Sequence, residues 1–300
     1  MKANTLDDNT VGIWYGLAAY TLWGFLPLYW KLLVTVPALE ILAHRIFWSF
    51  IFMILIVFSS GGRRALTYVV ADRKKMSYMF LCGFIISINW FTYIYAVNTN
   101  HVIEASMGYF INPLVVVLLG VLVLKEKLTR WQLVALILAA IGVAIITSQY
   151  GRVPWIAIFL ATTFAAYGLI KKLARVDSIT GLTLETLIVM PIALFFLGYL
   201  EIGGVGAMGS ASTAIKLILA GAGIVTATPL ILFSRGVEKT TFSMMGFLQY
   251  ITPTLTLFLG VFIFKEHFST IHLISFCFIW TALIIFTLTN IGLLKEPHKL

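Results

Sequence analysis

Charged residues are scarce in this sequence of 300 residues. Asp, Glu, Lys and Arg make up 11% of it, against roughly a quarter of a typical soluble domain, whereas apolar residues make up 60%. A soluble fold of this size has too little interior to bury so much apolar surface. A soluble protein is therefore excluded, and the apolar surface is expected to face lipid.

Cysteine is also scarce, since Cys82 and Cys277 are the two present. Both lie in apolar runs and belong to no motif, which excludes a disulfide framework and a cysteine-based metal site. The glycines of 204–209 fit G-x-G-x-x-G, but no strand precedes them, so a dinucleotide site is not expected. No motif predicts a cofactor or a metal.

The N-terminal segment 1–10 lacks the basic region and cleavage site of a signal peptide. We therefore expect the first apolar helix to be retained. The net charge of +9 comes from short basic clusters between apolar runs, a pattern typical of membrane orientation, and nucleic acid is not expected as a partner.

Ten segments have the roughly 20 mostly apolar residues that a membrane-spanning helix requires. Lipid offers no partner to open backbone groups, so each is expected to be helical. The sequence therefore predicts an all-α integral membrane protein with ten transmembrane helices, at 11–30, 37–59, 77–97, 102–124, 131–149, 153–170, 180–199, 214–234, 240–264 and 270–292.

The distribution of Lys and Arg predicts the orientation. With the N-terminus inside, the inner connections hold 16 of the 21 basic residues and the outer connections hold four. The positive-inside rule then places both termini in the cytoplasm, as expected of a multi-pass protein of the inner membrane. The remaining basic residue, Arg45, lies within the second span.

The two halves of the chain match when one is shifted by 140 residues. Because each half holds five spans, an odd number, the second half enters the bilayer upside down. We expect two inverted repeats, 11–149 with helices 1–5 and 153–292 with helices 6–10. Such halves are suited to alternating access, although an old duplication kept for packing would look the same. The matching residues are Ile111, Pro113, Leu119, Gly120, Val121, Lys125 and Glu126, against Ile251, Pro253, Leu259, Gly260, Val261, Lys265 and Glu266.

The matched prolines, Pro113 and Pro253, sit near the middle of spans 4 and 9. Each frees a carbonyl one turn earlier and permits a bend, so each is a candidate hinge or a structural kink. Asn112 and Thr252 precede them and could satisfy the freed backbone groups. The sequence does not separate hinge from kink.

Arg45 is the most costly residue to place in the bilayer, at about 2.5–3.5 kcal/mol near the centre. It is a candidate anion-binding or gating group, and the alternative is an ion pair with Glu104 that fixes helix register. His44, beside it, shares a face with Glu40 one turn away, and is either a titrating group or a neutral hydrogen-bond partner of that carboxylate.

Two further carboxylates lie inside spans. Glu104 and Glu185 are candidate proton carriers, and the alternatives are snorkelling and pairing with a helix N-terminus. Uncharged groups form a second set of candidates for lining a cavity for an amphipathic solute: Asn89, Trp90, Tyr93, Tyr109, Gln249 and Tyr250, together with Asn112. Lipid-interface positions are expected for Trp14, Trp30, Trp131 and Trp155.

Several of these residues fall in longer motifs that resemble the RarD subfamily of the EamA-type branch of the drug/metabolite transporter superfamily. The motifs are Glu40–Ser49, Trp90, Ala96–Asn98, Glu104–Pro113, Tyr167–Leu169, Glu185–Thr186, Gly223–Leu230 and Gly246–Thr254. The resemblance implies ten helices with both termini inside. It also implies a central cavity formed by spans 1–4 and 6–9, with spans 5 and 10 peripheral. RarD proteins are described as chloramphenicol-sensitivity permeases.

We therefore expect a secondary transporter, not an enzyme, that moves a small metabolite or drug, such as a chloramphenicol-like compound, by alternating access. Its partners are the solute and the bilayer, with protons as a candidate coupling ion. The alternatives are a lipid-modifying enzyme that uses Glu104, His44 or Glu185, and a sensor that transports nothing. Gly12 and Gly16 form a G-x-x-x-G that permits close helix packing and leaves a homodimer open.

Overall fold

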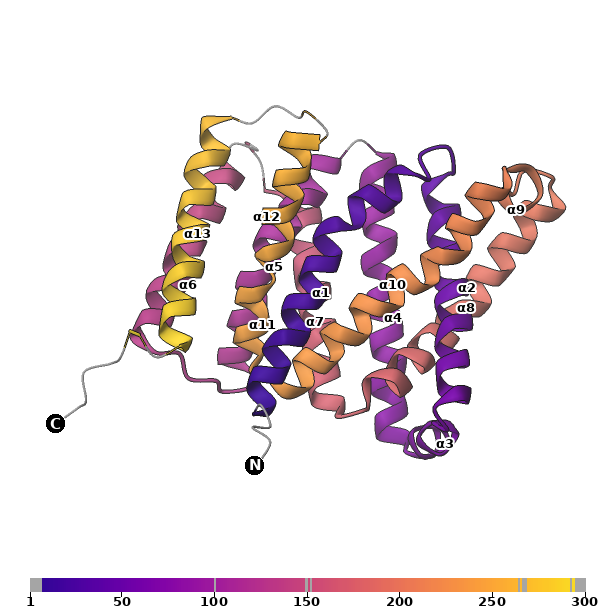
Figure 1. The fold of residues 1–300 in the computed structure, drawn as a ribbon, viewed down its shortest axis with the longest axis horizontal. Helices are drawn as coiled ribbons and strands as arrows, with labels where there is room; N and C mark the ends of the chain where they lie inside the picture. The colour runs from indigo at the N-terminus through magenta and orange to yellow at the C-terminus, as the bar shows by residue number, and fades with distance from the viewer. Residues whose placement is uncertain are drawn as a thin grey trace, which may run out of the picture.

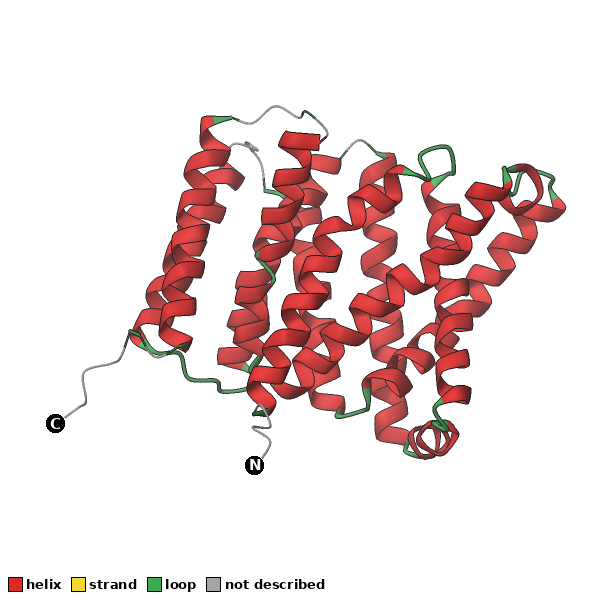
Figure 2. Ribbon diagram, in the orientation of Figure 1, coloured by secondary structure: helices red, strands yellow, loops and turns green. Residues whose placement is uncertain are grey.

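The protein is seen here in a computed structural model that describes residues 7–99, 101–148, 151, 153–263, 265, 269–291 and 293–294. All regular structure in these residues is helical, which confirms the all-α prediction (Figure 2). The helices are α1 (Asp8–Lys31), α2 (Ala38–Ser59), α3 (Arg63–Ala71), α4 (Arg73–Asn98), α5 (Val102–Leu122), α6 (Arg130–Ser148), α7 (Trp155–Ala174), α8 (Ser178–Ile202), α9 (Ala207–Ser210), α10 (Thr213–Lys239), α11 (Phe242–Leu248), α12 (Ile251–Phe258), the π-helix η1 (Leu259–Ile263) and α13 (Thr270–Asn290).

Ten helical segments of the described chain are long and apolar enough to cross a bilayer, as the sequence predicts. The segment Phe242–Ile263 combines α11, α12 and η1 into one span. The short helices α3 and α9 are not spans. Helix α3 was not expected, because its residues lie in a connection between two predicted spans.

The 140-residue offset of the sequence repeat is also the offset between helix starts. Four pairs of helices begin 140 residues apart: α2 and α8 at 38 and 178, α4 and α10 at 73 and 213, α5 and α11 at 102 and 242, and α6 and α13 at 130 and 270. The connections repeat as well, because Lys125 and Lys265 both adopt the left-handed backbone conformation at φ 58°.

The contacts between helices follow the same repeat: when each helix is replaced by its equivalent in the other half, a contact maps onto another observed contact. The contact of α1 with α10 corresponds to that of α7 with α4, and the contact of α1 with α12 corresponds to that of α7 with α5. The contact of α2 with α10 corresponds to that of α8 with α4. Equivalent helices also pair directly, α2 with α8, α5 with α11, and α6 with α13. The fold is therefore two inverted five-helix repeats, whereas the domain limits 11–149 and 153–292 stay a prediction.

The two ends of the bundle differ in charge. The end at which α1 begins and α13 finishes, the lower edge in Figure 1, is called here the basic face, and the other end the opposite face. The basic face holds Arg63, Arg64, Arg73, Lys74, Lys75, Lys125, Lys127, Arg130, Lys171, Lys172, Arg175, Arg235 and Lys239. The opposite face, within the described residues, holds Lys31, Lys216 and Lys265.

Helices α6 and α13 form a pair at one edge of the bundle, on the left in Figure 1, and their main contacts are with each other. Small residues permit this close pairing. Ala135 and Ala139 are buried in the same apolar cluster as Ile279 and Ala282 of α13, and a Cβ on Gly142 would lie 2.7 Å from the Ser275 carbonyl oxygen. The remaining spans therefore form the centre of the bundle and are the ones that can enclose a site.

The matched prolines differ in their local structure. Helix α5 continues through Pro113, whereas its equivalent span breaks between α11 and α12, just before Pro253. The Asn112 amide donates to the Ala161 carbonyl of α7, and the Thr252 hydroxyl donates to the Tyr20 carbonyl of α1. Both side chains thus bind a neighbouring helix and not the carbonyl that each proline frees. Whether the break acts as a hinge stays a prediction.

Candidate functional site

Arg45 of α2 lies among aromatic side chains within the bundle. Its Nε donates a hydrogen bond of 3.1 Å to the Thr226 hydroxyl of α10. Its guanidinium carbon lies 4.7 Å from the centre of the Trp30 ring and 5.4 Å from that of Trp90. Both distances fit cation–π contacts, so helices α1, α2, α4 and α10 together orient this guanidinium.

Two tyrosines complete this group. Tyr93 on α4 and Tyr109 on α5 lie near the Arg45 guanidinium. Their exposed fractions are 37% and 46%. Both tyrosines therefore keep accessible surface near the charged group. The six residues are called here the Arg45 site: Arg45, Trp30, Trp90, Tyr93, Tyr109 and Thr226.

Helix geometry places the site in one layer of the membrane. Arg45 lies seven residues from the start of α2, Tyr109 seven from the start of α5, and Trp90 eight from the end of α4. At about 1.5 Å per residue, each lies roughly 10–12 Å inside the opposite face. The site is therefore well within the hydrocarbon layer, where an ionised group requires compensation.

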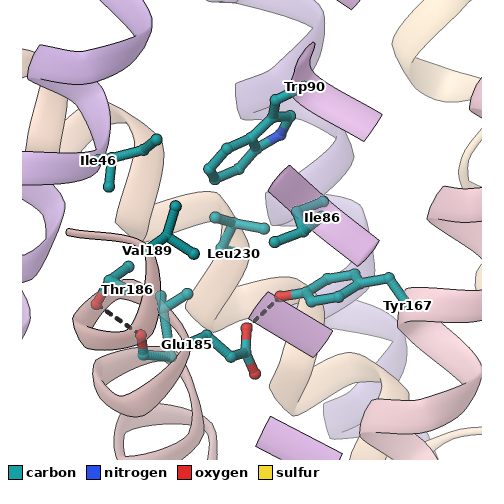
Figure 3. Close-up of a pocket in the computed structure, with 9 residues that line it drawn as sticks. Ile46, Ile86, Trp90, Tyr167, Glu185, Thr186, Val189 and Leu230 are labelled. Carbon is teal, nitrogen blue, oxygen red and sulfur yellow. Dashed lines mark hydrogen bonds between the residues drawn. The ribbon is translucent and has the colours of Figure 1, made fainter. Parts of the chain in front are cut away.

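A small cavity of about 10 Å³, the size of one water molecule, lies where the two repeats meet. Two repeat-related pairs line it, Ile46 with Thr186 and Trp90 with Leu230, each separated by 140 residues. Trp90 and Ile46 lie at one end of this cavity and Glu185 with Tyr167 at the other (Figure 3). Trp90 thus belongs to both the Arg45 site and this central cavity.

Glu185 is the repeat counterpart of Arg45, because it follows it by 140 residues. It lies seven residues into α8 from the basic face and is 2% exposed. Its carboxylate accepts a hydrogen bond of 2.9 Å from the Tyr167 hydroxyl and forms an ion pair of 2.6 Å with Lys171, which is 7% exposed. The internal two-fold thus places a cation and a carboxylate at equivalent depths from opposite faces.

A cavity of about 920 Å³ at the basic face leads to Glu185 and is called here the vestibule. Its lining is rich in charged groups: Lys74, Glu126, Lys171, Lys172, Arg175, Glu185 and Glu238. Lys172 donates to the Val237 and Thr240 carbonyls at the end of α10. Glu185 therefore lies at the meeting point of a polar vestibule and an apolar central cavity.

Five aromatic rings pack together in the core of the bundle. Tyr20 and Trp23 of α1, Phe164 and Tyr167 of α7, and Phe233 of α10 form a chain of ring contacts with centroids 5.5–6.3 Å apart. Such contacts are typical of well-packed aromatic cores. Counted along their helices, the rings of this aromatic cluster lie at depths that run from about that of Glu185 to about that of Arg45.

Comparison with known proteins identifies the family. The model of the EamA-like transporter family matches residues 10–148. The chain is 48% identical to the Bacillus subtilis protein named "Uncharacterized transporter YojE" over 288 residues, 95% of this chain and 96% of that one. It is 39% identical to Escherichia coli "Protein RarD" over 288 residues, 96% of this chain and 97% of that one. The chain belongs to the RarD subfamily of the EamA-type transporters.

The membership confirms the family that the motifs predict, within the drug/metabolite transporter superfamily, and it makes the chain a membrane transporter. A solved crystal structure resembles the fold with a TM-score of 0.71 at 17% identity, over 96% of this chain and all of that one. At this identity the likeness concerns the fold alone.

Three other predicted site residues of this RarD-type chain hold helix α7 in place. The Asn89 amide donates to the Leu160 carbonyl and the Thr163 hydroxyl, and Asn112 donates to Ala161. The Glu104 carboxylate accepts from the Ile156 amide in the first turn of α7. That contact matches the helix-terminus alternative considered for Glu104. The structure does not bring these residues to Arg45.

The predicted pairing of His44 with Glu40 belongs to another cluster. The ring of His44 lies 3.9 Å from the Glu40 carboxylate, which accepts a hydrogen bond from the Ala207 amide. Glu201 accepts from the Met208 amide. Two carboxylates therefore bind the first amides of α9, and Glu40 links this short helix to the start of α2. The glycine-rich connection that contains α9 thus has a structural role.

Gln249 and Tyr250 lie at the break between α11 and α12, and both are buried. The Gln249 amide oxygen and the Tyr250 hydroxyl have no hydrogen-bond partner among the described residues. They lie on the broken span and not in the Arg45 site as defined above.

Sequence reasoning missed several partners of the charged residues. The structure places Trp30 over the Arg45 guanidinium, whereas the sequence predicted a lipid-interface position for it. Lys171 and Thr226 were not considered as partners, although Thr226 lies in the motif Gly223–Leu230. The predicted alternative of an ion pair between Arg45 and Glu104 is not formed in the described part of the chain.

Proposed function

We propose that this chain is a secondary active transporter that moves a small metabolite or drug across the inner membrane by alternating access. The observation that supports this most is the placement of Arg45 and Glu185. These repeat-related charges lie at similar depths from opposite faces, the first in an accessible aromatic site and the second at the end of a vestibule. A solute path through the bundle would connect them.

The repeat symmetry of the helix contacts supports alternating access. The packing pairs of the first repeat have counterparts in the second, so an arrangement closed toward one face has an equivalent closed toward the other. The aromatic cluster lies at depths between those of Glu185 and Arg45, so we infer that it closes the path from the vestibule to the Arg45 site in the present arrangement. Rocking of the repeats would part this cluster and close the space around Arg45, and so expose a bound solute to the vestibule.

Proton coupling is proposed to occur at Glu185. Its carboxylate is buried and bound by Lys171 and Tyr167. Protonation would remove the charge that holds Lys171 and so weaken the link between α7 and α8. Because α7 also supplies Phe164 and Tyr167 to the aromatic cluster, a proton at Glu185 would favour parting of that cluster.

Replacing Glu185 by glutamine should therefore separate coupling from translocation. Glutamine keeps the shape and an acceptor oxygen but does not titrate, so proton-driven accumulation of solute should fall about tenfold or more, while solute exchange across the membrane continues. The measurement is uptake of labelled chloramphenicol into proteoliposomes with and without an imposed proton gradient, followed by counterflow. If chloramphenicol is not taken up, a panel of labelled metabolites replaces it.

The matched control is Glu238→Gln, which changes an exposed carboxylate of the same vestibule. It should transport like the wild type. Gradient-driven accumulation by Glu185→Gln at the wild-type level would contradict coupling at this residue. A wild-type protein that transports no solute of the panel in either direction would count against the transporter mechanism itself.

The orientation is a separate prediction. The basic face carries most of the described Lys and Arg residues, so it should face the cytoplasm, with both termini on that side. Green fluorescent protein fused after Leu300 should then fluoresce in cells, and alkaline phosphatase fused there should be inactive. Phosphatase fused after Lys216, at the start of α10, should be active. The reverse pattern would show the opposite orientation.

A further inference from the structure

The terminal nitrogens of Arg45 have no protein partner in the described part of the chain. The guanidinium donates through Nε to Thr226, and no described oxygen accepts a hydrogen bond from Nη1 or Nη2. No carboxylate of the described residues forms an ion pair with this guanidinium either. The other intramembrane carboxylates have their own partners, since Glu40 binds the Ala207 amide and Glu185 binds Lys171. The positive charge therefore lacks a counter-charge from these residues.

The guanidinium is nevertheless held in one orientation. Thr226 fixes Nε, and the Trp30 and Trp90 rings lie 4.7 and 5.4 Å from the guanidinium carbon. A guanidinium fixed at Nε can offer its two terminal nitrogens as a planar fork, the geometry that binds a carboxylate in a bidentate manner. Since a cation at this depth costs several kcal/mol without compensation, a bound anion would supply the missing charge.

The surroundings indicate the rest of the ligand. Trp30, Trp90, Tyr93 and Tyr109 offer ring faces and two phenol hydroxyls, and the tyrosines keep accessible surface. A flat apolar body stacks well on such rings. No carboxylate among the described residues pairs with Arg45 or belongs to the site, so a ligand ammonium would find no counter-charge there. A monoanion fits better than a zwitterion.

We propose that the Arg45 site binds an aromatic monocarboxylate, with the carboxylate on the Arg45 guanidinium and the ring between Trp30, Trp90 and the two tyrosines. This names the substrate class of the transporter proposed above and rests on that function. The proposal also suits coupling at Glu185, because a carboxylate anion that moves in the same direction as one proton crosses the membrane without net charge.

Binding to detergent-purified protein tests the proposal without relying on transport. The probes are benzoate, phenylacetate, 3-phenylpropionate and indole-3-acetate, each compared with its neutral primary amide, and phenylalanine as a zwitterion. Equilibrium dialysis with labelled probe should show that at least one acid binds about 30-fold or more tightly than its amide, the ratio expected when a buried ion pair loses one partner. Phenylalanine should bind more weakly than 3-phenylpropionate.

Variants assign the effect to Arg45. Arg45→Gln should lose about 30-fold or more in acid affinity while its affinity for the amide changes little. Arg45→Lys keeps the charge but not the fork, and should bind with intermediate affinity. It also keeps the test valid if the glutamine variant does not fold. The control is Lys216→Gln, which removes a cation at the start of α10, on the opposite face of the bundle. This variant should bind the probes like the wild type.

Three results would overturn the proposal: acids and amides that bind equally, an Arg45→Gln variant with wild-type acid affinity, or no acid that binds below about 10 mM. Its failure is distinguishable from that of the proposed function. Acid binding in a protein that transports none of these acids in either direction would keep the site and contradict the transporter mechanism. Transport of neutral solutes that Arg45→Gln leaves intact would keep the mechanism and reject the anion.

Discussion

Replacing Gly223 by alanine should destabilise this protein by about 3 kcal/mol or more. Gly223 lies on α10 where the helix crosses α2, and the Ser49 hydroxyl donates to its carbonyl. A Cβ at this position would overlap the Trp48 carbonyl group and lie 2.7 Å from the Ser49 amide nitrogen. Because these obstacles are backbone atoms, no side chain can rotate away, and the two helices would have to separate.

The helix propensity of alanine acts in the opposite direction but is smaller, at about 1 kcal/mol in its favour. The matched control is Gly198→Ala on α8, where a Cβ would meet no atom within 4 Å. Gly198→Ala should therefore be neutral or slightly stabilising. Gly83, the repeat counterpart of Gly223, should give an intermediate result, because its Cβ would lie 3.2 Å from the Glu185 carbonyl oxygen.

Thermal unfolding of the purified protein in detergent measures this series. The midpoint should fall on the order of 10 °C for Gly223→Ala and change little for Gly198→Ala. A midpoint of Gly223→Ala equal to that of the control would mean that α2 and α10 do not approach as closely as described. Since Trp48 follows Arg45 by about one turn on α2, any Gly223→Ala protein that folds should also bind solute more weakly.

The fold was largely predictable because its signals are local or repeated. Each span is a long apolar run. In lipid, a single segment can satisfy its own backbone hydrogen bonds only as a helix. The offset of 140 residues was visible around Pro113 and Pro253, and the structure extends it to helix starts. The π-helix and the break before Pro253 were not visible, since the equivalent α5 continues through its own proline.

The candidate site was predictable in part. The cost of charge in lipid was sufficient to select Arg45 and Glu185. Their partners were not predictable, because Trp30, Thr226 and Lys171 lie on other helices and packing alone brings them near. The spans carry apolar residues on every face of the helix. Hydrophobic periodicity therefore does not show whether Trp30 of α1 points into the bundle or toward lipid.

Gly120, Lys125 and Glu126 were recognised as part of the sequence repeat, but their structural role was not predicted. Lys125 adopts φ 58°, and the Glu126 amide donates to the Gly120 carbonyl, so the chain turns back on the end of α5. This turn places the Glu126 carboxylate against the start of α11. The missing side chain of Gly120 provides the space for this contact, because a Cβ there would lie 2.7 Å from Glu126 Oε2 and from the Ser243 hydroxyl.

Glu126→Ala should consequently be the second strongly destabilising change, at about 3 kcal/mol or more. The carboxylate accepts hydrogen bonds from the Phe242 amide at 2.6 Å, the Ser243 amide at 2.8 Å and the Ser243 hydroxyl at 2.6 Å. The two donor residues, Phe242 and Ser243, are buried. Alanine would leave the first amides of α11 unsatisfied, at a cost of about 1–3 kcal/mol for each buried donor.

The Glu126 carboxylate also joins the two repeats at the basic face, because it belongs to the first repeat and α11 to the second. Its loss should therefore lower the thermal midpoint on the order of 10 °C and reduce transport in proteoliposomes. Glu126→Gln keeps one acceptor oxygen and should fall between alanine and the wild type. Glu238→Ala, which removes an exposed carboxylate from the same vestibule, should unfold like the wild type. Equal midpoints for the two alanine variants would show that the Glu126 hydrogen bonds contribute no stability, and that the repeats are held together at this face by apolar packing of α5 against α11 alone.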